Sequence, residues 1–185
     1  LFLEDVQDDY QGVWTSDRYH RIGYVLGNFN ANCLVSHTAD NFDWLAENVV
    51  AKWSADALET IFQLPRYQYG TKLNLAITRS DIPKIVQIAE NHNSYVQLLN
   101  TLPQTVCHLD AFKRNLFLRR VHKDFDEVVL IDWAHCGRGA FGEELAALIG
   151  LTVFFFGEQP KRIYDLDEVA FSGYMEGLLT KHDMV

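Results

Sequence analysis

Residues 106–117 read VCHLDAFKRNLF, and this stretch decides how the rest of the chain is interpreted. It places His108, Asp110 and Asn115 inside what otherwise has the pattern of one strand followed by another. Asp and Asn are poor strand formers, and a short strand pair does not need them. Three residues at a fixed spacing can arise by accident, so the remainder of the chain must support or reject a functional interpretation.

The spacing His-x-Asp-x-x-x-x-Asn is typical of loops that catalyse phosphoryl transfer, where the Asp meets the substrate hydroxyl and the Asn holds a metal ion. A second carboxylate, Asp132, ends the apolar run VVLI, 17 positions after Asn115. The strand-like runs 116–121 and 127–132 predict a hairpin that returns Asp132 beside Asn115. The resulting cluster of Asp110, Asn115 and Asp132 offers oxygen donors, which suit a Mg²⁺ ion that keeps waters and is completed by phosphates.

Each of these residues also has a simpler interpretation. Asp110 would make local backbone hydrogen bonds, Asn115 would serve a turn, and Asp132 would be a solvated strand end or a helix cap. His108 favours a structural role, in which its ring ties the loop backbone to the core. The joint pattern is more specific than any of its members, and it favours the chemical interpretation.

The composition limits the classes of protein that fit. The chain has 185 residues, of which 48% are hydrophobic and 22% charged; this is globular composition and enough for one ordinary domain. A net charge of −9 argues against nucleic acid as the main partner and is compatible with a cationic small substrate.

The cysteines and the apolar segments of the sequence bear on the cellular compartment in which the protein is expected. Three cysteines, an odd number without close pairing, argue against a secreted disulfide framework and indicate a reducing cytosol. The longest apolar run, residues 145–156, is too short to span a bilayer, and residues 1–10 lack the features of a signal peptide. We therefore expect a cytoplasmic protein without a membrane partner.

Apolar periodicity predicts an α+β fold that is mostly helical, with a small cluster of short strands in the second half of the chain. Helices are expected at residues 16–35 with Ser16 as N-cap, at 41–53 and 54–64, between Pro83 and Pro103, and at 143–155 and 166–179. Short strands are expected at 105–110, 116–121 and 127–133, the last apolar enough to be buried. No repeat or linker divides the chain, so residues 1–185 are predicted to form one unit.

The sequence CHLDAFKRNLF, followed by VVLIDWAHCGRGAFGEELAAL, resembles the C-terminal lobe of the aminoglycoside phosphotransferase and choline kinase-like family, which has a protein-kinase-like fold. The family pattern is His-Gly-Asp, four residues, Asn, then Ile-Asp-Trp or Ile-Asp-Phe, and a short loop into a helix that begins with an acidic residue. His108, Asp110, Asn115, Asp132 and Glu144 stand at those positions.

The resemblance implies an ATP-dependent phosphotransferase that passes the γ-phosphoryl group to a hydroxyl of a small molecule. On that basis Asp110 would be the catalytic base or the carboxylate that orients the hydroxyl. Asn115 and Asp132 would ligate Mg²⁺, His108 would brace the loop, and Glu144 would hold the loop from below through hydrogen bonds.

Two further sets of residues follow from the same resemblance. Lys113 and Arg114 are candidates for steadying the charge of the transferring phosphate, with a solvated basic pair as the alternative. The opening LFLEDV is similar to the hinge strand between the two lobes of the family, where backbone groups near Glu4 and Val6 would bind the adenine of ATP. The resemblance thus extends from the hinge to the final helices.

The chain also departs from the family pattern. Leu109 stands where Gly is usual, and Phe112 stands where His or Lys is common. A glycine-rich phosphate loop and a strand lysine, which belong to the N-terminal lobe of the family, do not precede the matched region. Since the chain does not begin with Met, we expect it to be the catalytic lobe of a longer protein. Such a lobe alone would bind Mg-ATP weakly and turn over negligibly.

The segment after Asp132 bears on the substrate class. Only eleven residues separate Asp132 from Glu144, and none is Ser, Thr or Tyr, which leaves no room for the long activation segment of protein kinases. A small molecule is therefore favoured over a protein as acceptor. Two other functions stay open: a catalytically inactive kinase-like interaction module and, less favoured, a metal-dependent hydrolase built on Asp110 and Asp132.

Two other motifs carry weaker predictions. GRGAFG at 137–142 matches Gly-x-Gly-x-x-Gly, but the following helix begins with two glutamates that would face a pyrophosphate, and too little chain remains for a dinucleotide fold. We expect these glycines to let a loop turn tightly into the helix. The pairs Cys107-His108 and His135-Cys136 can each offer one ligand, which is too few for structural zinc, so small buried cysteines are the better interpretation.

Overall fold

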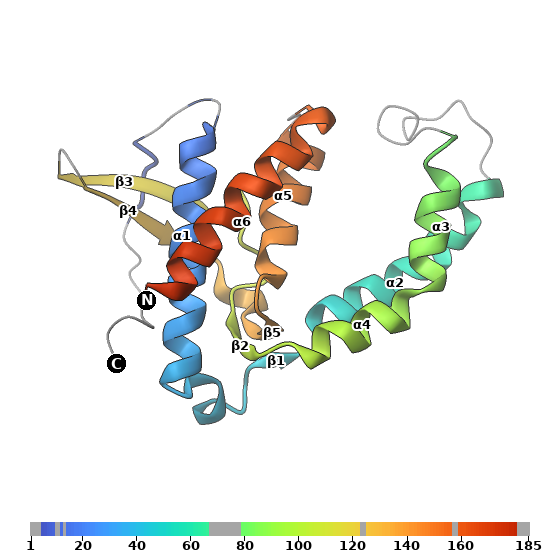
Figure 1. Cartoon of the computed structure of the whole chain (residues 1–185), viewed down its shortest axis with the longest axis horizontal. Helices are drawn as coiled ribbons and strands as arrows, with labels where there is room; N and C mark the ends of the chain where they lie inside the picture. Colours follow the sequence, from blue (N-terminus) through green and yellow to red (C-terminus); the bar gives the residue numbers. More distant parts are fainter. Residues whose placement is uncertain are drawn as a thin grey trace. The chain divides into compact units, whose positions relative to one another are not determined.

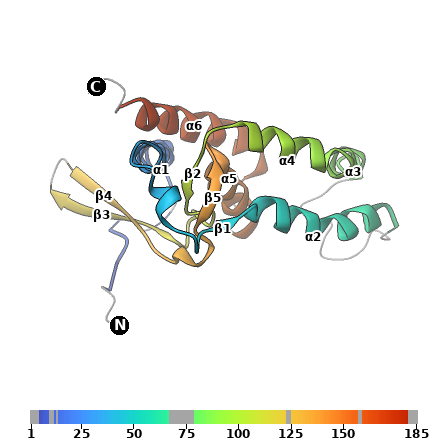
Figure 2. The ribbon, with the colours of Figure 1, turned by 90° about the horizontal axis from the view of Figure 1, so that it is seen from below.

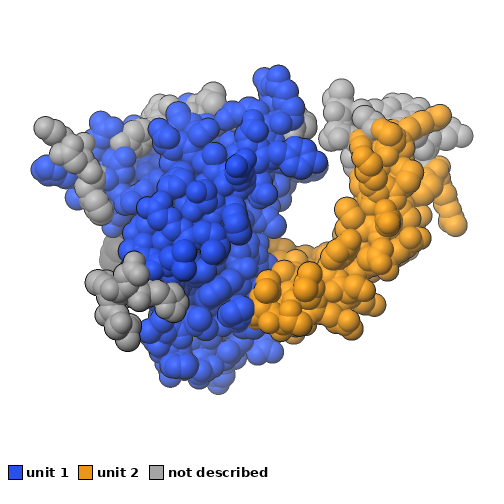
Figure 3. Space-filling model, viewed as in Figure 1, with its two compact units in different colours: residues 1–47, 103–185 blue, residues 48–102 orange. Residues whose placement is uncertain are grey.

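The computed structural model describes residues 5–9, 12, 14–66, 79–122, 125–156 and 159–180. The chain divides into two compact units, one formed by residues 1–47 and 103–185 and the other by residues 48–102 (Figure 3). Six α-helices and two small sheets occur in the described part of the chain, which confirms the predicted α+β class. The assignment of residues 1–185 to one catalytic lobe stays a prediction.

Three helices form the framework of the first unit: α1 (Ser16–Val35), α5 (Glu143–Phe156) and α6 (Ile163–Leu179) (Figure 1). Their apolar faces meet in one core, whose fully buried members include Tyr19, Ile22, Leu26, Leu148, Leu166, Ala170 and Tyr174. The bounds of α1 match the prediction, but its cap does not. Thr15, not Ser16, is the N-cap, because the Thr15 hydroxyl oxygen accepts from the backbone N–H of Arg18 at 3.3 Å.

Helices α1 and α6 cross at unusually close range. Two glycines on each helix make this approach possible: Gly23 and Gly27 on α1, and Gly173 and Gly177 on α6. A Cβ atom at any of the four would come within 2.0–2.2 Å of a backbone carbonyl oxygen of the other helix. Gly23 of α1 meets Ala170 of α6, and Gly27 meets Tyr174, so residue numbers increase in the same direction along both helices. Helices α1 and α6 are therefore parallel. This backbone-to-backbone contact fixes the two helices against each other.

A three-stranded sheet lies in the same unit. Its strands are β1 (Ala46–Glu47), β5 (Gly137–Ala140) and β2 (Gln104–Cys107), in the order β1-β5-β2. Strand β1 is parallel to β5, and β2 is antiparallel to β5 with Cys107 opposite Gly137. The prediction of a loop over residues 137–142 is therefore wrong for its first four residues. Gly137 is needed because a Cβ atom there would lie 2.4 Å from the Ala46 carbonyl oxygen, whereas a Cβ atom at Gly139 would make only a tight contact of 3.0 Å with the Cys107 sulfur.

A separate hairpin is formed by β3 (Leu116–His122) and β4 (Phe125–Leu130), which Figure 2 shows apart from the three-stranded sheet. The hairpin predicted from residues 116–121 and 127–132 is therefore present, and its register pairs Leu116 with Leu130. The expectation that the second strand is buried is wrong. Val128 to Leu130 are only half-buried, and Ile131, which follows the strand, is 38% exposed.

The second unit contains α2 (Val49–Gln63), α3 (Ile82–Glu90) and α4 (His92–Thr101). One helix, which begins only at Val49, replaces the two predicted at 41–53 and 54–64; residues 42–48 are not helical, and Ala46–Glu47 form β1. The helix continues through Ser54, because the Ser54 hydroxyl donates back to the Val50 carbonyl at 2.6 Å instead of capping a new helix. The single helix predicted after Pro83 is two, because Asn91 turns its side-chain amide back onto the Gln87 carbonyl at 2.8 Å and ends α3.

Short 3₁₀ turns connect these elements at Thr38–Asn41, Leu64–Arg66, Trp133–His135 and Pro160–Arg162. No helix in the described ranges is both long enough and apolar enough to span a bilayer.

Candidate active site

The segment between β2 and β3, residues 108–115, forms a loop braced by His108. The imidazole is fully buried, and its Nδ1 accepts from the backbone N–H of Asp110 at 3.3 Å. Nε2 must then carry the proton, which it donates to the Ile131 carbonyl at 2.8 Å. Trp133 packs on the ring at 4.5 Å between centroids. Burial lowers the pKa of His108, which favours this neutral form. The ring therefore ties the loop to the end of the hairpin.

Leu109 holds the turn of the loop in a left-handed conformation, with φ of 61°. Its side chain is nevertheless 3% exposed and lies against Gly139 of β5. A non-glycine residue in this region costs about 1–2 kcal/mol, so the burial of the side chain offsets backbone strain. The glycine that the resembled family has at this position would adopt the same turn without strain.

Asp110 and Asn115 are joined directly. The Asn115 Nδ2 donates to the Asp110 carbonyl oxygen at 2.9 Å and to Asp110 Oδ2 at 2.8 Å, which uses both hydrogens of the amide. Asn115 is 6% exposed, and its own backbone N–H donates to the Phe112 carbonyl at 2.8 Å. Among the described residues none donates to Asn115 Oδ1. That oxygen is therefore available as a ligand.

Asp132 returns to the same place through the hairpin. The backbone N–H of Ile131 donates to the Asn115 carbonyl at 3.0 Å, and Asp132 is the next residue. Its backbone is left-handed, with φ of 60°, and its side chain is exposed. The negative charges of Asp110 and Asp132 both act on the His108 ring and raise its pKa against the effect of burial. The structure thus pairs Asn115 with Asp110 and places the segment that carries Asp132 beside Asn115. Two left-handed residues, Leu109 and Asp132, lie in these segments.

Lys113 and Arg114 lie against aromatic rings at the end of α5. The Lys113 ammonium lies 5.4 Å from the Phe156 ring centroid and donates to the Gly12 carbonyl at 3.3 Å. The Arg114 guanidinium lies 5.5 Å from the Phe155 ring centroid and 5.7 Å from that of Phe156. Cation–π contacts therefore join both cations of the loop to the C-terminal end of α5.

The structure describes only one of the two residues of the predicted hinge. Glu4 lies outside the described residues, and Val6 is half-buried. The segment that follows runs along β3, where the Asp9 backbone N–H donates to the Leu118 carbonyl at 3.0 Å, and the Arg120 backbone N–H donates to Asp9 Oδ2 at 2.8 Å. The start of the described chain is thus attached to the hairpin that follows Asn115.

Glu144 lies fully buried beneath the loop. Its Oε1 accepts from the Asn30 side-chain amide at 2.9 Å. Oε2 makes no hydrogen bond of normal geometry with any described residue, although the His108 backbone amide and the Cys107 thiol lie near enough to favour the charged form. Burial is the larger effect and raises the pKa of Glu144 to about 7.

Sequence reasoning missed two residues of this site, Asn30 and Tyr174. Both are fully or almost fully buried, and the Tyr174 hydroxyl donates to Asn30 Oδ1 at 2.7 Å. Asn30 follows Ile22 and Leu26 at four-residue intervals on the buried face of α1. A polar residue in register with an apolar stripe was the available signal, because a buried amide needs partners.

The oxygen donors of Asn115 and Asp132 fit a magnesium ion with few protein ligands. No group of three or more His, Cys, Asp or Glu side chains that could hold a metal occurs in the described part of the chain. Asp132 and the Oδ1 of Asn115 provide a carboxylate and an amide oxygen. A Mg²⁺ site with few protein ligands, completed by waters and phosphates, has this composition. A closed zinc site does not.

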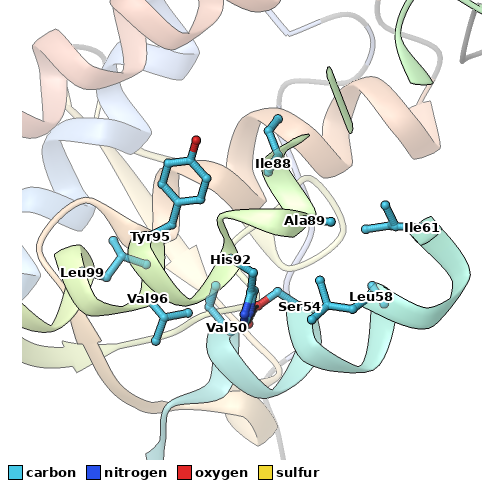
Figure 4. A pocket seen from close by; sticks show the side chains of 11 residues that line it. Val50, Ser54, Leu58, Ile61, Ile88, Ala89, His92, Tyr95, Val96 and Leu99 are labelled. Atoms are coloured by element: carbon cyan, nitrogen blue, oxygen red, sulfur yellow. Dashed lines mark hydrogen bonds between the residues drawn. The ribbon is translucent and has the colours of Figure 1, made fainter. Parts of the chain in front are cut away.

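A pocket in the second unit is a different kind of cavity. It has a volume of about 320 Å³ between α2, α3 and α4, and it is lined by Val50, Ser54, Ala57, Leu58, Ile61, Ile88, Ala89, His92, Tyr95, Val96 and Leu99 (Figure 4). Its lining is almost entirely apolar. A polar contact within it joins Ser54 Oγ to His92 Nε2 at 2.6 Å. Without a carboxylate, lysine or arginine in its lining, this pocket does not suit phosphate or metal chemistry.

Comparison with known proteins identifies the family of this chain. A model of the phosphotransferase enzyme family matches residues 38–177, which include the loop, the hairpin and Glu144. The chain belongs to this family and is therefore assigned phosphotransferase activity in general terms. No curated protein and no solved structure matches the chain.

Proposed function

We propose that this chain is the C-terminal catalytic lobe, with a protein-kinase-like fold, of an ATP-dependent small-molecule kinase. The reaction would transfer the γ-phosphoryl group of ATP to a hydroxyl of the acceptor. The observation that carries the proposal is the direct pairing of Asn115 with Asp110 at the point where the hairpin returns Asp132. Phosphoryl transfer depends mainly on positioning and charge neutralisation, which these three side chains can supply.

Asp110 is the residue that meets the acceptor. Asn115 occupies Oδ2 of its carboxylate at 2.8 Å, so Oδ1 is the oxygen that accepts a hydrogen bond from the substrate hydroxyl. The same amide fixes the carboxylate in one orientation. Asp110 thereby aligns the hydroxyl and takes its proton as the oxygen–phosphorus bond forms.

Asn115 Oδ1 and the Asp132 carboxylate would hold Mg²⁺. When bound, the ion neutralises phosphate charge. The buried, preorganised position of Asn115 supports this role, as does the exposed position of Asp132, which leaves room for waters and phosphates. Lys113 and Arg114, which belong to the loop and lie against Phe156 and Phe155, would add positive charge to it.

The nucleotide would also need groups that this sequence does not contain. We propose that Glu4 and Val6 belong to the interlobe hinge that binds adenine, and that an N-terminal lobe of the same protein supplies a glycine-rich loop and a lysine. The acidic net charge of −9 favours a cationic acceptor. We place the protein in the cytoplasm, because its three cysteines are free and buried.

The test is a transfer assay on the natural full-length protein, with labelled ATP and panels of amino alcohols, aminoglycosides, sugars and nucleosides as acceptors. We expect transfer to one acceptor class and its loss in Asp110→Asn, with nucleotide binding retained. Asp126→Asn, an equivalent change on the β3–β4 hairpin, serves as the matched control and should stay active. Nucleotide hydrolysis without any acceptor, unchanged by Asp110→Asn, would contradict the proposal.

A further inference from the structure

A buried polar network lies under the end of β2, directly before the loop. Its centre is the side-chain amide of Asn30 on α1. The amide Nδ2 donates to the Val106 carbonyl at 2.9 Å and to Glu144 Oε1 at 2.9 Å. The amide Oδ1 accepts from the Tyr174 hydroxyl at 2.7 Å, and that hydroxyl accepts from the Gly142 backbone N–H at 2.9 Å. Four parts of the fold therefore meet at one amide.

The hydroxyl of Tyr174 determines which way this amide faces. An Asn side chain has a donor end and an acceptor end, and a flip would exchange them. Because Tyr174 receives the Gly142 N–H, its own hydrogen points to Asn30 Oδ1. The Asn30 NH₂ group is then directed at Val106 and Glu144. A second hydrogen bond, which the Thr105 hydroxyl donates to the Asn30 backbone carbonyl at 2.8 Å, attaches β2 to the same turn of α1.

We propose that Asn30, oriented by Tyr174, is a positioning residue of the catalytic loop that acts through Val106 and Glu144. The loop begins directly after β2, so the amide sets where the strand ends and holds the Glu144 carboxylate close to the His108 backbone. This inference rests on the proposed role of Asp110 in the loop. It concerns residues that touch neither the nucleotide nor the acceptor.

The charge of Glu144 provides a readout of the network. The other titratable groups that act on it or beside it are Cys33 on α1, Cys107 on β2, Cys136 before β5, Glu143 on α5 and Tyr174 on α6. Burial raises the pKa of each thiol and of the phenol, so these four are neutral at pH 7. Burial raises the pKa of Glu144 to about 7, whereas the hydrogen bond from Asn30 lowers it. A loosened Asn30 should therefore raise it further.

The experiment is an NMR pH titration of the His108 backbone amide in the 185-residue chain. We expect a midpoint near pH 7 that disappears in Glu144→Gln. This variant is needed because the His108 ring also titrates, with a pKa lowered by burial. Tyr174→Phe removes one hydroxyl and should move the Glu144 midpoint upward by about half a pH unit or more. Thr152→Val, which removes another buried hydroxyl from the first unit, should leave it unchanged.

Kinetics on the full-length protein complete the test. Tyr174→Phe should lower kcat about tenfold with little change in KM for nucleotide, and it should shift the pH profile of kcat in the same direction as the amide titration. Asn30→Leu should act more strongly where it folds. Lower thermal stability in Tyr174→Phe, with an unmoved midpoint and pH profile, would assign the network a structural role only and overturn the inference. Should Asp110→Asn retain transfer while the midpoint still shifts, the proposed function fails and the coupling between Asn30 and Glu144 stands.

Discussion

The side-chain amide of Asn115 donates to two oxygen atoms of Asp110, the backbone carbonyl at 2.9 Å and the carboxylate Oδ2 at 2.8 Å. Both hydrogens of the amide are used within the pair, which leaves the Asn115 Oδ1 and the second Asp110 oxygen for other partners. In the proposed function, Asn115 would bind the metal and Asp110 would bind the hydroxyl of the acceptor. The geometry of each depends on its neighbour.

Asn115→Asp should therefore inactivate the protein even though it adds a stronger metal ligand. The new carboxylate cannot donate to Asp110, and two negative charges would face each other across 2.8 Å. We expect turnover of the full-length protein to fall at least about 100-fold, and the chain to lose about 1–3 kcal/mol of unfolding free energy. Steady-state kinetics and denaturant unfolding measure the two effects. Activity within a factor of about two of wild type would remove the pair from the mechanism.

Leu109 offers a test of backbone strain in the loop. Both Leu109→Ala and Leu109→Gly remove a side chain that is 3% exposed, and each should destabilise the fold. Gly is normally less stable than Ala in regular structure, but at φ of 61° only Gly avoids the left-handed penalty. We expect Leu109→Gly to be more stable than Leu109→Ala by about 1 kcal/mol in denaturant unfolding. The reverse order would show that the loop is not strained there.

The glycine contacts between α1 and α6 predict that the effect of a Gly→Ala substitution on stability depends strongly on its position. Gly27→Ala would place a Cβ atom 2.1 Å from the Tyr174 carbonyl oxygen, so the helices must separate. We expect a loss of about 1–3 kcal/mol of unfolding free energy, as for other overpacked cores. Gly150→Ala on α5 is the matched control, because its new methyl group would meet no atom within 4 Å, and it should stabilise the protein by about 0.5–1 kcal/mol. Equal effects at both positions would contradict the close packing.

Glu144 predicts a particular dependence of stability on pH. Its pKa is about 7 in the fold against an ordinary value of 4.5, so the folded state binds more protons between these values. Its contribution is therefore fully present below pH 4.5 and is lost as pH rises through 7, by about 3 kcal/mol over the window. His108, whose pKa burial lowers, has the opposite slope. The difference between wild type and Glu144→Gln in denaturant unfolding isolates the Glu144 contribution, and a flat difference from pH 4.5 to 7 would refute it.

The sequence was sufficient where local pattern determines structure. The bounds of α1, α5 and the β3–β4 hairpin follow from apolar periodicity, and the hairpin brings Asp132 to Asn115. Local pattern failed at Ser54 and Asn91, where side-chain hydrogen bonds to the helix backbone decided whether a helix continued or ended.

The supporting network was not predictable in the same way. Asn30 and Tyr174 are 144 positions apart, and their contact depends on the close crossing of α1 and α6. A buried polar residue on an apolar face could be noticed from sequence, but its partners arise only from tertiary packing.

We propose that Asp110, Asn115 and Asp132 gather around one metal–phosphate position. The most direct test of this proposal is Mn²⁺ titration in the presence of ATP, with NMR line broadening measured along the backbone. Amides of residues 110–115 and 131–133 should broaden together, and Asp132→Asn should abolish the effect in both segments. Broadening of one segment without the other, or broadening that survives Asp132→Asn, would contradict the proposal.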